Sequence, residues 1–131
     1  MTKVLIIEDN TTVATLYRNT LRAAGFRVET AADGAKGLAA VGSFRPDLVL
    51  LDLMLPSIDG LTLLRKLRAD PASTALPVIV FSNAFTGERL NDVWEAGATQ
   101  VLAKASSSPK QVVEAVRATL ADRAAQHPRQ S

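Results

Sequence analysis

The 131-residue sequence contains no cysteine and only one histidine, His127, which lies in a polar C-terminal stretch. The absence of cysteine excludes disulfides, a thiolate nucleophile and a zinc site built on cysteine. With a single histidine outside the apolar part of the chain, neither a Ser-His-Asp triad nor a histidine metal cluster is expected. Any functional site must therefore be built from other side chains.

Long apolar runs and dense charge are also missing. No apolar run approaches the length of a membrane-spanning helix, and a strand pattern already begins at Lys3, which leaves no room for a signal peptide. The formal net charge is only +2 and the basic residues are spread along the chain, so direct binding to nucleic acid is not expected. Since 47% of the residues are hydrophobic, the chain can form a core. We expect one soluble, cytoplasmic domain that contacts neither nucleic acid nor membrane.

Strand-like and helix-like segments alternate along the chain. Short apolar runs with the character of strands occur at 3–7, 26–31, 48–51, 77–81 and 101–103. Helical stripes separate them, and Asp33, Asp59 and the Ser108–Gln111 capping box are expected to begin three of the helices. This rhythm predicts an α/β fold with a parallel five-stranded sheet and helices on both faces. The chain turns polar near its end, so we expect residues 1–121 to form the domain and residues 122–131 a flexible tail.

Polar side chains follow four of the five expected strands. Glu8 and Asp9 follow the first strand, and the third, fourth and fifth strands are followed by Asp52, Ser82 and Lys104. In a parallel sheet covered on both sides, ligands bind beyond the carboxyl ends of the strands. Each residue also has a purely structural explanation, as a helix cap, a turn residue or a surface charge. Because four separate strands end in this way, and because buried charges are costly unless they are paired or metal-bound, we expect one common site.

Three carboxylates in one crevice repel each other and favour a hard cation such as Mg²⁺, which prefers oxygen ligands. Asp52 stands alone at the end of the central strand, and we expect it to act as the nucleophile toward a phosphoryl group. Glu8 and Asp9 are adjacent and are better suited to hold the metal. The Lys104 ammonium and the Ser82 hydroxyl would then stabilise the charge on the phosphoryl oxygens.

Four stretches carry a more specific pattern: VLIIEDN at 4–10, PDLVLLDLMLPSIDG at 46–60, PVIVFS at 77–82, and the Gly97-Ala98 pair that leads to Lys104. Through them the chain resembles the receiver domain of two-component response regulators, from residue 3 to about residue 121. The resemblance implies a flavodoxin-like, doubly wound sheet with strand order 2-1-3-4-5. It implies that Mg²⁺ is bound by Glu8, Asp9, Asp52 and the backbone carbonyl of Met54. It also implies that the phosphoryl oxygens are contacted by Ser82 and Lys104.

The resemblance further implies a phosphoprotein of signal transduction and not an enzyme. A sensor histidine kinase or a histidine phosphotransfer protein would supply the phosphoryl group to Asp52, in a two-component system or a phosphorelay. The added charge would switch a surface that a downstream protein recognises. One candidate arrangement is a homodimer through the face formed by the helix bearing Leu90 and Trp94, the strand 101–103 and the last helix.

Two other functions fit the same sequence. A module with the receiver fold could dock or dimerise without using phosphate. A Mg²⁺-dependent phosphatase or a flavin-binding protein could be built on a similar sheet. The absence of histidine from the expected fold, and of a phosphate-binding glycine loop after the first strand, argues against this second alternative.

Three positions depart from the usual pattern of receiver domains. Val101 stands where an aromatic side chain is usual, three residues before the lysine. Ala105 replaces the proline that usually follows the lysine in a cis peptide, and because a cis bond before alanine costs about 3 kcal/mol, we expect a trans bond and a reshaped loop. Asn83 follows the hydroxyl residue, where a small side chain is usual. We expect it either to crowd the pocket or to donate a hydrogen bond.

Overall fold

The computed structural model describes residues 1–83 and 87–126. Its centre is a sheet of five parallel strands in the order β2-β1-β3-β4-β5. The strands are β1 (Lys3–Ile7), β2 (Arg27–Ala31), β3 (Leu48–Leu51), β4 (Val78–Ser82) and β5 (Gln100–Ala103). The predicted fold class and strand order are confirmed, and every predicted strand bound lies within one residue of the observed one.

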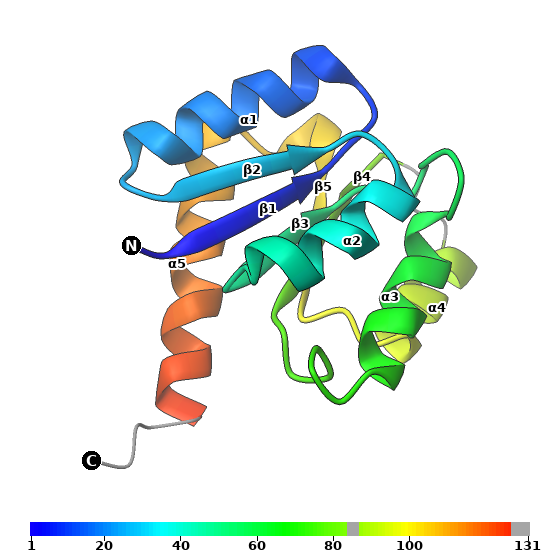
Figure 1. The fold of residues 1–131 in the computed structure, drawn as a ribbon. Coiled ribbons are helices and arrows are strands. Elements are labelled where there is room, and N and C mark those ends of the chain that lie inside the picture. Colours follow the sequence, from blue (N-terminus) through cyan, green and yellow to red (C-terminus); the bar gives the residue numbers. More distant parts are fainter. Residues whose placement is uncertain (84–86, 127–131) are drawn as a thin grey trace.

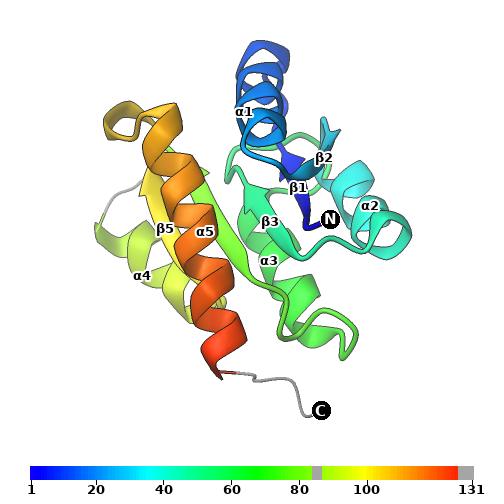
Figure 2. The same ribbon diagram turned by 90° about the vertical axis from the view of Figure 1, so that its left-hand side faces the viewer.

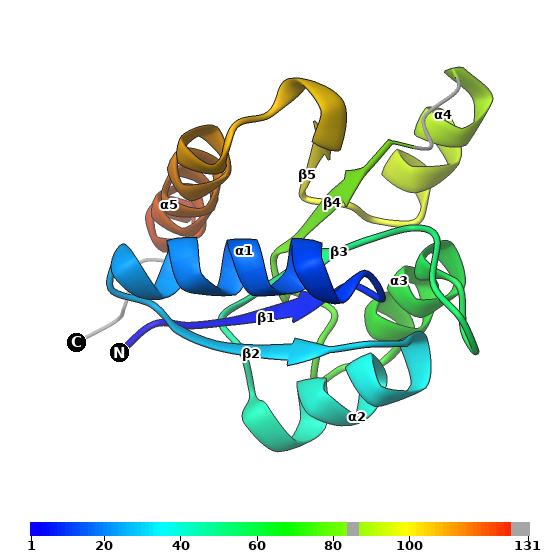
Figure 3. The same cartoon turned by 90° about the horizontal axis from the view of Figure 1, so that it is seen from above.

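Helices cover both faces of the sheet (Figures 1 and 3). They are α1 (Thr11–Ala23), α2 (Gly34–Phe44), α3 (Gly60–Ala69), α4 (Gly87–Glu95) and α5 (Pro109–Gln126), with a short 3₁₀ helix η1 (Lys104–Ser106) after β5. On one face α1 and α5 contact each other, and α5 runs beside β5 (Figure 2). On the other face lie α2, α3 and α4. Among the described helices, none is long and apolar enough to cross a lipid bilayer.

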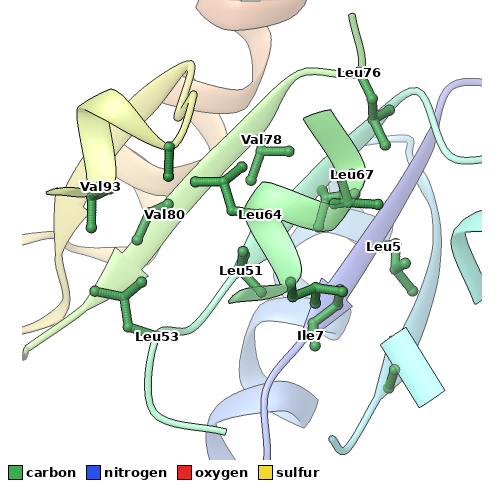
Figure 4. Packing of buried hydrophobic residues seen from close by; sticks show 14 of the residues in the cluster. Leu5, Ile7, Leu51, Leu53, Leu64, Leu67, Leu76, Val78, Val80 and Val93 are labelled. Atoms are coloured by element: carbon green, nitrogen blue, oxygen red, sulfur yellow. The ribbon is translucent and has the colours of Figure 1, made fainter. Parts of the chain in front are cut away.

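The alternation of side chains along the strands divides the core into two layers. On β1, Leu5 and Ile7 belong to the layer beneath α2, α3 and α4, whereas Val4 and Ile6 belong to the layer beneath α1 and α5. Figure 4 shows the first layer, in which Leu64 of α3 points toward the sheet. Because helices cover both faces, β1, β3 and β4 are buried on both sides, which explains their continuous apolar sequences. The edge strand β2 is partly exposed, in agreement with its more alternating sequence.

Polar side chains begin the helices where the local sequence predicts them. Asp33 and Asp59 each accept a hydrogen bond from the backbone N–H three residues further on, at 2.8 Å and 3.0 Å. Ser108 and Gln111 form the predicted reciprocal capping box, with distances of 3.2 Å and 2.8 Å. Asn10 caps α1 in the same way at 3.1 Å, which we did not predict.

The last helix enters the expected C-terminal tail. α5 continues to Gln126 and so includes residues 122–126. Residues 127–131 of the expected tail lie outside the described part of the chain. The boundary at residue 121 therefore stays a prediction.

Gly60 allows the start of α3 to lie directly against the backbone that follows β3. Its N–H donates a hydrogen bond of 2.9 Å to the Leu53 carbonyl oxygen. A Cβ atom at Gly60 would lie 2.3 Å from the Asp52 carbonyl oxygen and 2.6 Å from the Leu53 Cα atom. Because these are backbone atoms, they cannot relieve the clash by a change of side-chain rotamer. Because Gly60 has no side chain, the start of α3 can pack against the backbone of Asp52 and Leu53 and fix its position.

We predict that Gly60→Ala lowers the free energy of unfolding by about 2 kcal/mol, a usual size for overpacking. Gly42→Ala is the matched control, because Gly42 lies inside α2 and an added Cβ atom would meet nothing within 4 Å. There alanine should raise the free energy of unfolding by up to about 1 kcal/mol through its higher helix propensity. Urea denaturation measures both variants, and equal effects of the two substitutions would contradict the close packing at Gly60.

Candidate functional site

The carboxyl ends of four strands bring the predicted site residues to one edge of the sheet (Figure 1). Glu8 and Asp9 follow β1, Asp52 follows β3, Ser82 ends β4, and Lys104 follows β5. The parallel register aligns the last residues of neighbouring strands. The side chains that come next along the chain are therefore neighbours in space, although they are far apart in sequence.

Three carboxylates lie close together at this edge. One oxygen from each of Glu8, Asp9 and Asp52 lies within 4.8 Å of the others. Glu8 and Asp52 are buried, with exposed fractions of 4% and 7%, whereas Asp9 is exposed to solvent. These oxygens are hard anionic donors of the kind that a divalent cation such as Mg²⁺ prefers.

The Lys104 ammonium lies between the two buried carboxylates. Its Nζ atom contacts Glu8 Oε1 directly and lies 3.2 Å from Asp52 Oδ2. The Phe81 ring adds a cation–π contact, with its centroid 5.8 Å from Nζ. Tyr17 packs edge-on against Phe81, with the ring centroids 5.0 Å apart. The predicted meeting of Lys104 with Asp52 is thus observed, whereas the contact with Phe81 was not predicted.

Backbone amides add hydrogen bonds to the buried carboxylates. The Asn10 N–H donates to Glu8 Oε2 at 3.2 Å, and the Met54 N–H donates to Asp52 Oδ1 at 3.3 Å. The backbone of Met54 therefore lies next to Asp52, while its side chain is 59% exposed. The role of the Met54 carbonyl as a metal ligand stays a prediction.

Ser82 is buried at the end of β4, where it is aligned with Ala103, the residue before Lys104. Its place in the sheet is therefore the predicted one, next to the loop that carries the lysine. The contact of its hydroxyl with a phosphoryl oxygen stays a prediction.

Burial changes the proton affinity of the charged groups. It raises the pKa of Glu8 to about 7; the Asp52 charge adds to this effect, and hydrogen bonds from Lys104 and Asn10 oppose it. Burial alone would lower the pKa of Lys104, but its contacts with Glu8 and Asp52 outweigh burial and raise this pKa above its usual value. The site therefore holds a firmly charged ammonium beside a carboxyl group that titrates near neutral pH.

The loop after β5 has the trans geometry that the sequence predicts. The described residues contain no cis peptide bond, so the Lys104–Ala105 bond is trans, and Lys104 begins η1. The sequence left open whether Asn83 crowds the pocket or donates a hydrogen bond. The structure shows that its side-chain oxygen instead accepts one, from the Ala105 N–H at 2.7 Å. Val101 is partly buried and packs against the core layer beneath α2, α3 and α4.

We predict that the stability of the metal-free protein depends on pH through Glu8. A carboxyl group that binds its proton more tightly in the folded state stabilises the fold at low pH, and this contribution is lost between about pH 4.5 and pH 7. The Glu8→Gln side chain cannot titrate, so this variant does not lose that contribution. As the pH rises from 4.5 to 7, its free energy of unfolding should therefore increase relative to that of the wild type, by on the order of 2 kcal/mol. Urea denaturation with a chelator at both ends of the window measures the difference. A difference that does not change with pH would contradict the raised pKa.

Comparison with known proteins identifies the family. Residues 4–117 match the response regulator receiver domain. The chain is 40% identical over 82 residues to the DNA-binding dual master transcriptional regulator RpaA of Synechocystis sp., which covers 63% of this chain and 34% of RpaA. It is 36% identical over 118 residues to the DNA-binding response regulator MtrA of Mycobacterium tuberculosis, which covers 90% of this chain and 50% of MtrA. The chain thus spans half of the length of these curated relatives, or less.

Solved structures agree with this result. The CheY-like response regulator receiver domain protein of Methanospirillum hungatei matches with a TM-score of 0.90 and 25% identity, over 96% of this chain and 98% of that one. Receiver domains are signalling modules of two-component systems. Since the family pattern extends over residues 4–117, this chain belongs to the response regulator receiver domain family.

Proposed function

We propose that Asp52 accepts a phosphoryl group from a phosphohistidine, in a two-component system or a phosphorelay. The observation that carries the proposal is the convergence of Lys104 with two buried carboxylates, Glu8 and Asp52. A buried carboxylate beside a fixed ammonium is suited to become an acyl phosphate, because the ammonium neutralises part of the charge that the phosphoryl group brings. Membership of the receiver family supports the same function.

In the proposed step an oxygen of Asp52 attacks phosphorus. A P–O bond forms, the P–N bond of the phosphohistidine breaks, and its electron pair returns to the imidazole nitrogen of the donor. The Lys104 ammonium and the Ser82 hydroxyl contact the outer phosphoryl oxygens, where the charge is spread. After transfer, the phosphorylated Asp52 carries more negative charge than the free carboxylate, and this charge lies beside Lys104.

The acidic residues fit a magnesium ion. Glu8, Asp9, Asp52 and the backbone carbonyl of Met54 would hold it. The fit rests on the three carboxylate oxygens, which lie within 4.8 Å of one another and are the ligand type that Mg²⁺ prefers. When bound, the ion neutralises charge on the transferring phosphoryl group.

The proposed partners follow from this role. A sensor histidine kinase or a histidine phosphotransfer protein supplies the phosphoryl group, and a downstream protein recognises the face formed by α4, β5 and α5. We also propose this face, which includes the exposed Trp94 of α4, as the surface of a homodimer. RpaA and MtrA are DNA-binding proteins at least twice as long as the matched region, and no DNA binding is inferred for this chain.

The chain acts in this proposal as a switch and not as an enzyme with turnover. The receiver domain is proposed to comprise residues 1–121, although α5 itself continues to Gln126. The alternative, a module that docks without phosphate, is not favoured, because the acidic residues and the lysine are all in place.

We predict that incubation with Mg²⁺ and acetyl phosphate adds one phosphoryl group to the protein, and that Asp52→Asn abolishes the addition. Asp122→Asn is the matched control, because Asp122 is exposed on α5, and it should react like the wild type. Intact-mass spectrometry measures the product. Phosphorylation of Asp52→Asn at the wild-type rate would show that Asp52 is not the acceptor.

Removal of the ammonium should slow the same reaction. We expect Lys104→Ala to reduce the rate roughly 100-fold, the usual effect of losing one group that stabilises transition-state charge. Lys66→Ala removes an exposed ammonium on α3 and should leave the rate unchanged. The proposed role of Lys104 is wrong if the two variants react equally fast while both stay folded by circular dichroism.

A further inference from the structure

A side-chain hydrogen bond joins the two loops that carry Ser82 and Lys104. The Asn83 Oδ1 atom accepts it from the Ala105 N–H at 2.7 Å. Asn83 directly follows Ser82, and Ala105 directly follows Lys104. The bond therefore lies one peptide away from each of the two residues that would contact the phosphoryl group.

This hydrogen bond depends on both unusual positions, because it needs a residue other than proline at position 105 and a side-chain acceptor at position 83. A proline at position 105 would have no N–H to donate, and a small apolar side chain at position 83 would have no oxygen to accept. The trans peptide after Lys104 and the 3₁₀ turn of η1 give the Ala105 N–H its position. Two separate departures from the family pattern thus form a single contact.

The contact extends the connection between β4 and β5 beyond their backbone pairing. The last residues paired between these strands are Ser82 and Ala103. β5 is one of the two edge strands of the sheet, so its backbone pairs with β4 alone, whereas each central strand pairs with two neighbours. The Asn83–Ala105 hydrogen bond provides a further link after the ladder stops, at the level of Lys104.

We propose that Asn83 is a positioning residue, which holds the backbone of Lys104 so that the ammonium reaches Asp52. The proposal rests on the function proposed above and adds a residue outside the set that would contact the phosphoryl group. A lysine side chain is long and flexible, so its ammonium is well placed only where its backbone is fixed. The same bond keeps Ser82 and Lys104 in a common geometry, because it joins their loops.

A double-mutant cycle tests the proposal. Asn83→Ala removes the acceptor, Ala105→Pro removes the donor, and Ala105→Gly retains the N–H as the matched control. Phosphorylation by acetyl phosphate with Mg²⁺ is followed by intact mass. We expect Asn83→Ala to slow it roughly three- to tenfold, as for the loss of one hydrogen bond, and Ala105→Gly to keep the wild-type rate. In the Ala105→Pro background, Asn83→Ala should change the rate less than about twofold.

Two further measurements separate positioning from a loss of the fold. In Asn83→Ala, hydrogen exchange of the Ala105 amide, measured by NMR, should be faster than in the wild type. The circular dichroism spectrum of this variant should match that of the wild type, which shows that the slower reaction does not come from a loss of the fold. These measurements test the bond even if Ala105→Pro does not fold. A wild-type phosphorylation rate in Asn83→Ala, or full additivity of the two substitutions, would overturn the proposal.

Failure of the proposed function gives a different result from failure of the positioning role. If the wild type takes up no phosphoryl group at Asp52, the function is wrong and the positioning role falls with it. If the wild type is phosphorylated and Asn83→Ala reacts equally fast, only the positioning role is wrong.

Discussion

Two carboxylates, Glu8 and Asp52, are nearly buried at the edge of the sheet, and one ammonium group lies between them. Removing carboxylates from water is costly, and their proximity adds repulsion. The Lys104 ammonium offsets both effects because it contacts both groups. The remaining cost of burial, together with the charge of Asp52, raises the pKa of Glu8 to about 7. The proposed binding of Mg²⁺ and of a phosphoryl group at this site rests on this balance.

The parallel sheet makes this arrangement possible. All of its strands point the same way, so residues from the beginning, the middle and the end of the chain meet at one edge. Apolar layers on both faces hold the strands, and local contacts then fix the site residues. Gly60 brings α3 against the backbone of Asp52, and the amides of Asn10 and Met54 hold the carboxylates.

The charged residues of the site follow the usual pattern of receiver domains more closely than three other positions near it do. Glu8, Asp52 and Lys104 follow the family pattern, whereas positions 83, 101 and 105 depart from it. Val101 packs against the core, and Asn83 and Ala105 are joined by a hydrogen bond. Alanine at position 105, where proline is usual, provides a backbone N–H. The side-chain oxygen of Asn83 accepts a hydrogen bond from it. These departures therefore replace one way of holding the loop after β5 with another.

The amino-acid sequence predicts the strands, their order through the family resemblance, the caps formed by Asp33, Asp59 and Ser108, and the residues that meet at the sheet edge. Such features depend on residues a few positions apart or on the common direction of parallel strands, so a linear pattern records them. The burial of Glu8 beside the exposed Asp9 could not be predicted in this way, because the packing of the whole fold selects which of two adjacent side chains faces inward. The contact between Asn83 and Ala105 could not be predicted either, since these residues are 22 positions apart and meet only because the strands that precede them, β4 and β5, are paired in register.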